Sequence, residues 1–137
     1  MVKGVSCVQR SLELLRSEGG YPDIVERFVK PPRMKFGFRK DLWNFVDIVC
    51  MMPTTGELLF VQVTSMGGIP EHRRNCFSNP LLPMLVESGG VVELHGWRKL
   101  SKKDANGKKT KVKIWECFRE RYDNLEHLNK QILSVLK

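Results

Sequence analysis

The stretch RKDLWNFVDIVCMMPTTGELLFVQVTS, residues 39–65, predicts two buried strands joined by a short turn. Residues 45–52 and 58–63 are almost continuously apolar, as expected of strands that are covered on both faces. Between them lies PTTGE, residues 53–57, in which Gly56 is expected to take a left-handed backbone conformation. The stretch therefore predicts a buried β-hairpin.

The apolar pattern predicts further elements on both sides of this hairpin. Apolar residues recur at helical spacing in residues 5–18 and 125–136, and Gly19-Gly20 follows the first of these helices. The segments in between divide as follows: strands at 23–29, 91–97 and 111–119, a basic loop at 33–40, a flexible break at 66–68, helical turns at 71–87 interrupted at Pro80 and Pro83, and a lysine-rich connection at 99–111 with Asn106-Gly107 at its tip. This order predicts one mixed α/β domain over residues 1–137, with a central sheet flanked by helices.

The composition is that of a basic globular domain. The chain has 137 residues, 42% of them hydrophobic, and a net charge of +8. Such an excess favours nucleic acid as a partner, because lysine and arginine neutralise phosphates and release counterions; a basic surface that serves only solubility is the alternative. The N-terminus lacks the apolar region of a signal peptide, no apolar run approaches a membrane span, and the four cysteines are scattered, so we expect a cytoplasmic protein.

Asp47 and Gln62 are polar positions inside the two apolar runs, so each needs a partner if it is buried. A metal-dependent phosphodiesterase would supply one, since such chemistry needs oxygen ligands around Mg²⁺. Gln62 and Thr64 share one face of their strand, and the Val63 backbone carbonyl is a further oxygen ligand. A structural hydrogen bond between Asp47 and Gln62 is the other explanation.

Three segments of the chain form a recognisable set: Asp41-Leu42-Trp43-Asn44-Phe45-Val46-Asp47, Gln62-Val63-Thr64-Ser65 and His95-Gly96-Trp97-Arg98-Lys99. Taken together, they are similar to segments of the PD-(D/E)xK nuclease superfamily, and more closely to small Holliday-junction-resolvase-like proteins of phages and prophages. The similarity extends from about Arg10 to Trp115. It implies the restriction-endonuclease-like fold, a Mg²⁺ or Mn²⁺ cofactor, cleavage of DNA that includes branched DNA, and a homodimer. It also implies that Asp47, Gln62 and Val63 hold the metal.

The chain departs from the superfamily pattern at two positions. Gln62 stands where a second acid is expected, and Thr64 stands where a lysine is expected. The lysine helps to orient the attacking water and to offset developing charge. Another residue would then supply this cation, and the candidates are Arg73, Arg74, Arg39 and Lys40. The third acidic ligand is expected to be Glu13, with Glu18 and Asp41 as further candidates. The expected catalytic set is Asp47, Gln62, Thr64 and Arg73.

These residues also have structural interpretations. Asp47 can be satisfied by backbone N–H groups or by Arg39, and Glu13 can be a solvated helix residue. His95 is expected to be packed rather than a general base. Trp43, Trp97 and Trp115 are expected in the core rather than as stacking platforms for bases.

Nucleic-acid contacts are expected from two basic segments, where Phe36 and Phe38 are the candidates for base stacking. The expected contact residues are Arg33, Lys35, Arg39, Lys40, Arg74, Arg98, Lys99, Lys102 and Lys103. The sequence thus predicts a metal-dependent DNA endonuclease. The alternatives are a catalytically degenerate nuclease-fold protein that binds DNA, and an interaction scaffold.

Overall fold

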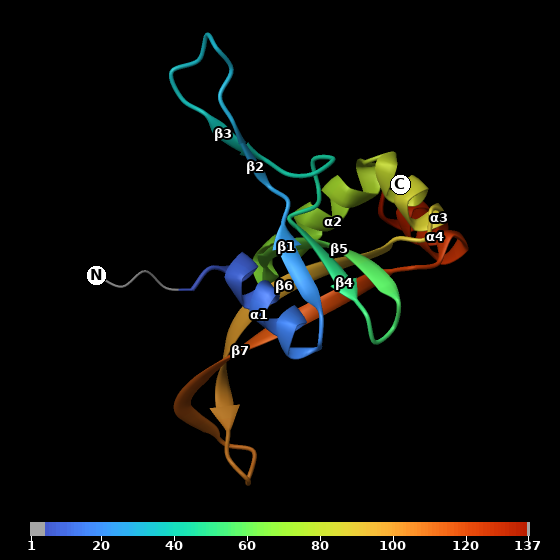
Figure 1. Ribbon diagram of the computed structural model, residues 1–137. Helices are drawn as coiled ribbons and strands as arrows, with labels where there is room; N and C mark the ends of the chain where they lie inside the picture. Colours follow the sequence, from blue (N-terminus) through green and yellow to red (C-terminus); the bar gives the residue numbers. More distant parts are fainter. Residues whose placement is uncertain (1–4, 137) are drawn as a thin grey trace.

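A five-stranded sheet, in the order β1-β4-β5-β6-β7, forms the centre of the computed structural model, which describes residues 5–136 (Figure 1). Its strands are β1 (Tyr21–Ile24), β4 (Ile48–Met52), β5 (Glu57–Ser65), β6 (Val91–Lys103) and β7 (Lys109–Tyr122). β5 and β6 run parallel, and the other neighbours in the sheet run antiparallel. The domain is therefore mixed α/β, as the sequence predicts.

The described part of the chain contains four α-helices and one 3-10 turn. They are α1 (Cys7–Ser17), the 3-10 turn η1 (Met66–Gly68), α2 (Ile69–Ser78), α3 (Leu81–Glu87) and α4 (Leu125–Val135). Ser6 caps α1 by accepting a hydrogen bond from the Gln9 N–H at 3.1 Å, and Asn124 caps α4 in the same way. Gly19 ends α1 with a φ of +87°, which glycine adopts without steric cost.

The two faces of the sheet carry separate cores. α1 covers one face, where Leu12 and Leu15 pack against Ile48, Val61 and Val63. The other three helices cover the opposite face, and the residues packed there are Phe45, Val46, Phe60, Ile69, Cys76, Phe77, Leu82, Val86, Val92, Leu94, Tyr122 and Leu128. Side chains alternate along β5, so Gln62 lies on the second face while its neighbours Val61 and Val63 lie on the first.

Two hairpins project from this body in opposite directions in Figure 1. The first, here called the basic arm (residues 27–40), contains β2 (Arg27–Val29) and β3 (Phe38–Lys40), which pair only with each other. The second, the lysine arm (residues 99–113), is the far end of β6 and β7, with Asn106-Gly107 at its tip and a φ of +79° at Gly107.

The structure corrects the expected strands in three places. Residues 23–29 do not form one strand, because the chain leaves the central sheet after Ile24 and resumes as β2 in the basic arm. Part of the expected loop at 33–40 is β3. The expected connection at 99–111 is mostly strand, because β6 and β7 continue to the hairpin tip despite their exposed lysines.

The expected helix breaks are half correct. The chain does break between α2 and α3 at Asn79-Pro80, but Pro83 lies inside the first turn of α3, where its missing N–H leaves no hydrogen bond unmade. None of the helices in residues 5–136 combines the length and apolarity needed to cross a membrane.

Candidate metal centre

A tight loop brings Asp41 beside Asp47. Leu42 and Val46 form an isolated antiparallel bridge, with each N–H donating to the other residue's carbonyl at 3.0 Å. Asp41 and Asp47 flank this bridge, so they are the next pair across it and their side chains leave on the same side. The loop thus converts a separation of six residues into direct proximity.

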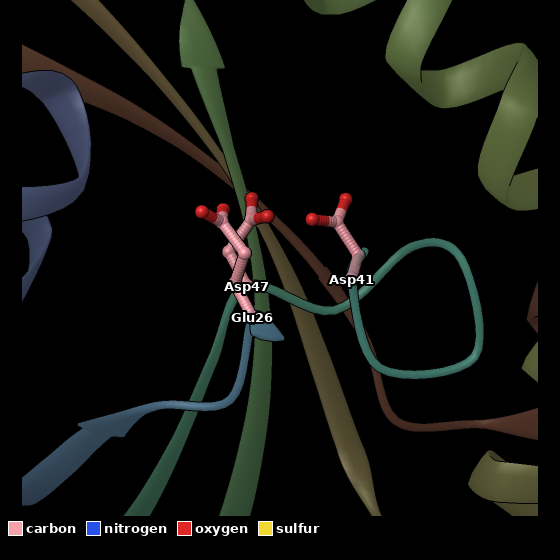
Figure 2. Close-up of side chains that lie close together, drawn as sticks. All are labelled: Glu26, Asp41 and Asp47. Atoms are coloured by element: carbon pink, nitrogen blue, oxygen red, sulfur yellow. The ribbon is translucent and has the colours of Figure 1, made fainter. Parts of the chain in front are cut away.

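Glu26 joins them from a distant part of the chain. The Val25 N–H donates to the Asp47 carbonyl at 3.0 Å, which fixes the end of β1 alongside residue 47. Glu26 follows immediately, and its carboxylate also accepts a 2.8 Å hydrogen bond from Arg39 in the basic arm. One oxygen from each of Glu26, Asp41 and Asp47 lies within 4.8 Å of the others. Figure 2 shows the three carboxyl groups on the same side of the loop; they are called the acid group below.

Asp47 is the buried member of the acid group, with 5% of its surface exposed. Burial, together with the charges of Asp41 and Glu26, raises the pKa of its carboxyl to about 8, although a hydrogen bond from the Val63 N–H acts in the opposite direction. A cation placed among these carboxylates would favour the ionised form of Asp47 and displace its proton.

The strand partners of Asp47 lie where the sequence predicts, but they make different contacts. Gln62 Nε2 donates to Asp47 Oδ2 at 2.9 Å, and the Val63 N–H donates to the same oxygen at 2.8 Å. Gln62 thus presents nitrogen, not oxygen, to the acid. Thr64 is half-buried, and a Cβ built at Gly68 would lie 2.2 Å from its Oγ1, so the start of α2 occupies the space beside it.

Two expected site residues lie elsewhere. Glu13 is exposed on α1 and does not belong to the acid group. Arg73 on α2 forms a bidentate ion pair with Glu120 of β7, and this contact raises the pKa of the arginine above its usual value. Its guanidinium is therefore committed to a structural contact. Arg74, also on α2, is exposed.

Apart from Arg74 on α2, the expected nucleic-acid residues lie in or next to the two arms rather than forming one surface. Arg33, Lys35, Arg39 and Lys40 lie in the basic arm, together with the exposed side chains of Phe28, Met34, Phe36 and Phe38, and the Arg39–Lys40 end of the arm adjoins the acid group. Arg98, Lys99, Lys102 and Lys103 lie on β6 toward the lysine arm, and Arg98 pairs there with Glu116 at 2.8 Å. In Figure 1 the two arms point away from each other.

Two adjoining hollows open beside the acid group. One, of about 380 Å³, lies along the basic arm and is lined by Arg39, Lys40 and Asp41 among others. The other, of about 500 Å³, is lined by Val25, Arg27, Lys40, Asp41, Leu42, Trp43, Asn44 and Leu81. Arg27 and Lys40 are adjacent across the β2–β3 ladder, and neither has an ion-pair partner among residues 5–136. Positive and negative side chains therefore share one hollow.

The acid group has the donors that Mg²⁺ or Mn²⁺ requires. Both ions prefer carboxylate and carbonyl oxygens, and Mg²⁺ binds them at about 2.0–2.1 Å, so ligands on opposite sides of the ion are about 4 Å apart. A mutual spacing within 4.8 Å matches this with little movement of the side chains. The cation would also offset the electrostatic repulsion among the three carboxylates. In the part of the chain described, Glu26 is the only one of the three that pairs with a basic side chain. The residues fit the metal.

A second polar cluster resembles a catalytic triad but serves the core. Ser11 Oγ lies 2.8 Å from His95 Nδ1, and His95 Nε2 lies 2.9 Å from Glu93 Oε1. The Trp97 indole N–H donates to Ser11, and Arg119 donates to Glu93, so every group has a partner when His95 carries its proton on Nε2. Ser11 and His95 have no exposed surface, so no substrate reaches the hydroxyl. The expectation of a packed His95 is confirmed.

The expected burial of the tryptophans is correct for Trp97 and wrong for the other two. Trp97 is 8% exposed, whereas Trp43 is 41% and Trp115 is 40% exposed. The Arg10 guanidinium lies 3.9 Å from the centroid of the Trp115 ring, so part of that ring is covered. Trp43 and Asn44 have φ values of +53° and +67°. A bulky residue in this conformation costs on the order of 1–3 kcal/mol, and such strain is concentrated at functional sites.

Sequence reasoning missed Glu26 as a member of the acid group. Its segment, DIVERFV, alternates polar and apolar residues, which favours an uninterrupted strand with Glu26 on its solvent face. The one available signal is the pair Pro31-Pro32, which limits the second half of the segment to a short edge strand. The hydrogen bond from the Val25 N–H to the Asp47 carbonyl, a contact between distant parts of the chain, fixes where the chain leaves the sheet.

The comparisons with known proteins are negative: no family model, no curated protein and no solved structure matches this chain.

Proposed function

We propose that this protein is a metal-dependent DNA endonuclease with the restriction-endonuclease-like fold, and that the acid group holds Mg²⁺ or Mn²⁺. The observation that carries the proposal is the meeting of Glu26, Asp41 and Asp47 beside a hollow that is lined by Asp41, Arg27 and Lys40. A carboxylate cluster binds the cation, and adjacent cations attract a phosphodiester. The segments similar to the PD-(D/E)xK superfamily add support, because Asp47 stands at the position of its first acid.

Each residue of the proposed site then has a defined role. Asp47 and Asp41 bind the cation and orient it toward the hollow, and Glu26 completes the group while Arg39 holds its side chain in place. The bound cation would polarise the phosphate and lower the pKa of a water molecule. Lys40 and Arg27 bind the substrate phosphate. Lys40 immediately precedes Asp41 and lines the same hollow, so it is the residue that would supply the positive charge that Thr64 lacks.

A catalytically silent DNA-binding protein is the second candidate. The specific observation in its favour is Thr64, which stands where the superfamily has its lysine and packs against Gly68. This candidate keeps the arms and the acid group but predicts no cleavage with any divalent metal.

The test is cleavage of labelled branched and linear DNA by purified protein with Mg²⁺ or Mn²⁺, alongside Asp47→Asn and Asp41→Asn. Asp23→Asn is the matched control, because Asp23 is an exposed acid on β1 outside the acid group. The nuclease proposal expects cleavage by the parent protein and the control, and at least about a 10²-fold loss in the two site variants. DNA binding without cleavage would favour the second candidate, and neither binding nor cleavage would favour a scaffold.

A further inference from the structure

Trp43 lies on the loop between Asp41 and Asp47. The loop holds the Trp43 backbone firmly, since Asn79 Nδ2 donates to its carbonyl at 2.8 Å and Asn44 N–H donates to the Asp41 carbonyl at 3.1 Å. Its ring contacts Phe60 with a centroid separation of 5.9 Å at a tilt of 35°. A large apolar side chain is thus fixed in a strained position while 41% of it remains exposed.

Trp43 lines three hollows that share residues with one another. It lines the 500 Å³ hollow beside the acid group, a second of about 280 Å³ with Leu81, Met84 and Leu85, and a third of about 680 Å³ with Asn75 and Asn79. Trp43 lines the first hollow together with Arg27 and Lys40, which have no ion-pair partner in the part of the chain that the structure describes. An aromatic ring next to two cations is the pairing that single-stranded nucleic acid requires, with the ring for a base and the cations for its phosphates.

We propose that Trp43 stacks on an unpaired nucleobase while Arg27 and Lys40 bind the adjacent phosphates, so that the protein prefers DNA with a single-stranded segment to intact duplex. Bases in a duplex are already stacked on each other, so a protein ring gains this contact only where a base is unpaired. The charge of the hollow selects the occupant, because an apolar peptide segment would leave Arg27 and Lys40 without partners. The preference rests on the proposed action on DNA and names its substrate class.

The first measurement is binding of a single-stranded 12-nucleotide oligomer without divalent metal, so that no result depends on cleavage. Trp43→Ala is expected to weaken binding by about tenfold or more, and Trp43→Phe to retain most of the affinity, since either aromatic ring can stack. Blunt duplex of the same length is expected to bind both variants within about twofold of the parent protein. Trp115→Ala is the matched control: Trp115 has nearly equal exposure, 40%, and also lies beside two cations, Arg10 and Lys99, but it lines none of the three hollows.

The second measurement reads tryptophan fluorescence during the same titration. Stacking on the indole is expected to quench the emission of the parent protein and of Trp115→Phe, and the quenching is expected to disappear in Trp43→Phe. This arm stays decisive if Trp43→Ala fails to fold. Unchanged quenching in Trp43→Phe, or an equal loss of affinity in Trp115→Ala, would overturn the proposal. A failure of the nuclease proposal would look different: the protein would not cleave DNA, but it would still bind the oligomer and its tryptophan fluorescence would still be quenched.

Discussion

The side-chain amide of Gln62 donates a 2.9 Å hydrogen bond to Oδ2 of Asp47, and both groups are buried on the same face of the sheet. The amide nitrogen therefore faces the acid, and the amide oxygen can reach a cation on Asp47 only if the amide rotates and this bond breaks. The Val63 N–H, at 2.8 Å from the same oxygen, needs no such change. Gln62 thus stabilises the carboxylate, and its role as a direct metal ligand stays a prediction.

Gln62→Glu tests this relationship. The substitution replaces a hydrogen-bond donor with a carboxylate against Asp47, so we expect the free energy of unfolding without metal to fall by roughly 1–3 kcal/mol. Added Mn²⁺ is expected to raise the melting temperature of this variant more than that of the parent protein, because binding to the folded state stabilises it. Thermal unfolding with and without Mn²⁺ measures both effects. Gln9→Glu, on the exposed surface of α1, is the control and should show neither the loss of stability nor the larger response to Mn²⁺. Equal increases in melting temperature with Mn²⁺ in all three proteins would contradict the prediction.

The raised pKa of Asp47, about 8, predicts how metal binding depends on pH. Below that value the carboxyl carries a proton that the cation must displace, so affinity for Mn²⁺ is expected to rise from pH 6 to pH 8 and proton release to fall. Calorimetry in buffers of different ionisation enthalpy measures both quantities. Asp47→Asn should bind weakly at every pH without this dependence. An affinity of the parent protein that is constant over this range would refute the assignment of the proton to Asp47.

The same pKa predicts a pH dependence of stability without metal. The folded protein holds the Asp47 proton more tightly than the unfolded chain does, where the pKa is near 3.8. Between about pH 4 and pH 8 the folded state therefore binds more protons, and the free energy of unfolding contributed by this group falls as pH rises. Urea unfolding at pH 5 and pH 8 should show a smaller decrease for Asp47→Asn than for the parent protein. The prediction fails if the two decreases are equal.

Much of the fold follows from local sequence, and the part that does not follow is informative. The hairpin of β4 and β5 is predicted because its strands are apolar and Gly56, with a φ of +75°, permits the turn. The basic arm is not predicted, because β2 and β3 carry charged and aromatic side chains and have no buried face. They are strands because they pair with each other. Patterns of burial cannot reveal a hairpin that buries nothing.

The site divides in the same way. Asp47 is identifiable because a charge inside an apolar strand is unusual. The role of Glu26 cannot be read from the sequence, because it depends on where two loops meet in space. The exposure of Trp43 cannot be read either, because it depends on a backbone conformation that tryptophan rarely adopts. Arg73 illustrates the opposite error: its place after the motif strand favours a catalytic role, but its partner Glu120 lies 47 residues away on β7.

The buried charges on the α1 face predict a large effect on stability. Burial raises the pKa of Glu93, but hydrogen bonds from His95 and Arg119 and the arginine charge lower it to about 2 overall. Glu93→Gln leaves buried donors without a charged partner, so we expect a loss of roughly 3–5 kcal/mol in the free energy of unfolding at pH 7. Glu116→Gln, which breaks the exposed pair with Arg98, should cost less than about 1 kcal/mol. Urea unfolding compares them, and similar losses in the two variants would show that the Glu93 network is not a major source of stability.

Lys40 and Arg73 give the sharpest test of which cation assists cleavage. Lys40 lines the hollow with Asp41 and lacks an ion-pair partner among residues 5–136, whereas Arg73 on α2 is held by Glu120 of β7. Removing a charge that stabilises the transition state costs about 10²-fold in kcat, so we expect a loss of that order for Lys40→Ala at saturating DNA. Arg73→Ala should lower the melting temperature but leave the rate per folded molecule within about threefold.

Lys108→Ala, at the tip of the lysine arm, controls for the loss of one positive charge and should affect only the salt-dependent affinity for DNA. Single-turnover kinetics separates the two effects, because at saturating protein the rate no longer reflects binding. A large loss of rate in Arg73→Ala with Lys40→Ala unaffected would reverse the assignment, because the motif lysine would then be replaced from α2. Loss in Lys40→Ala alone would instead place the compensating cation in the basic arm, one residue before Asp41, and would explain how Thr64 is tolerated on β5.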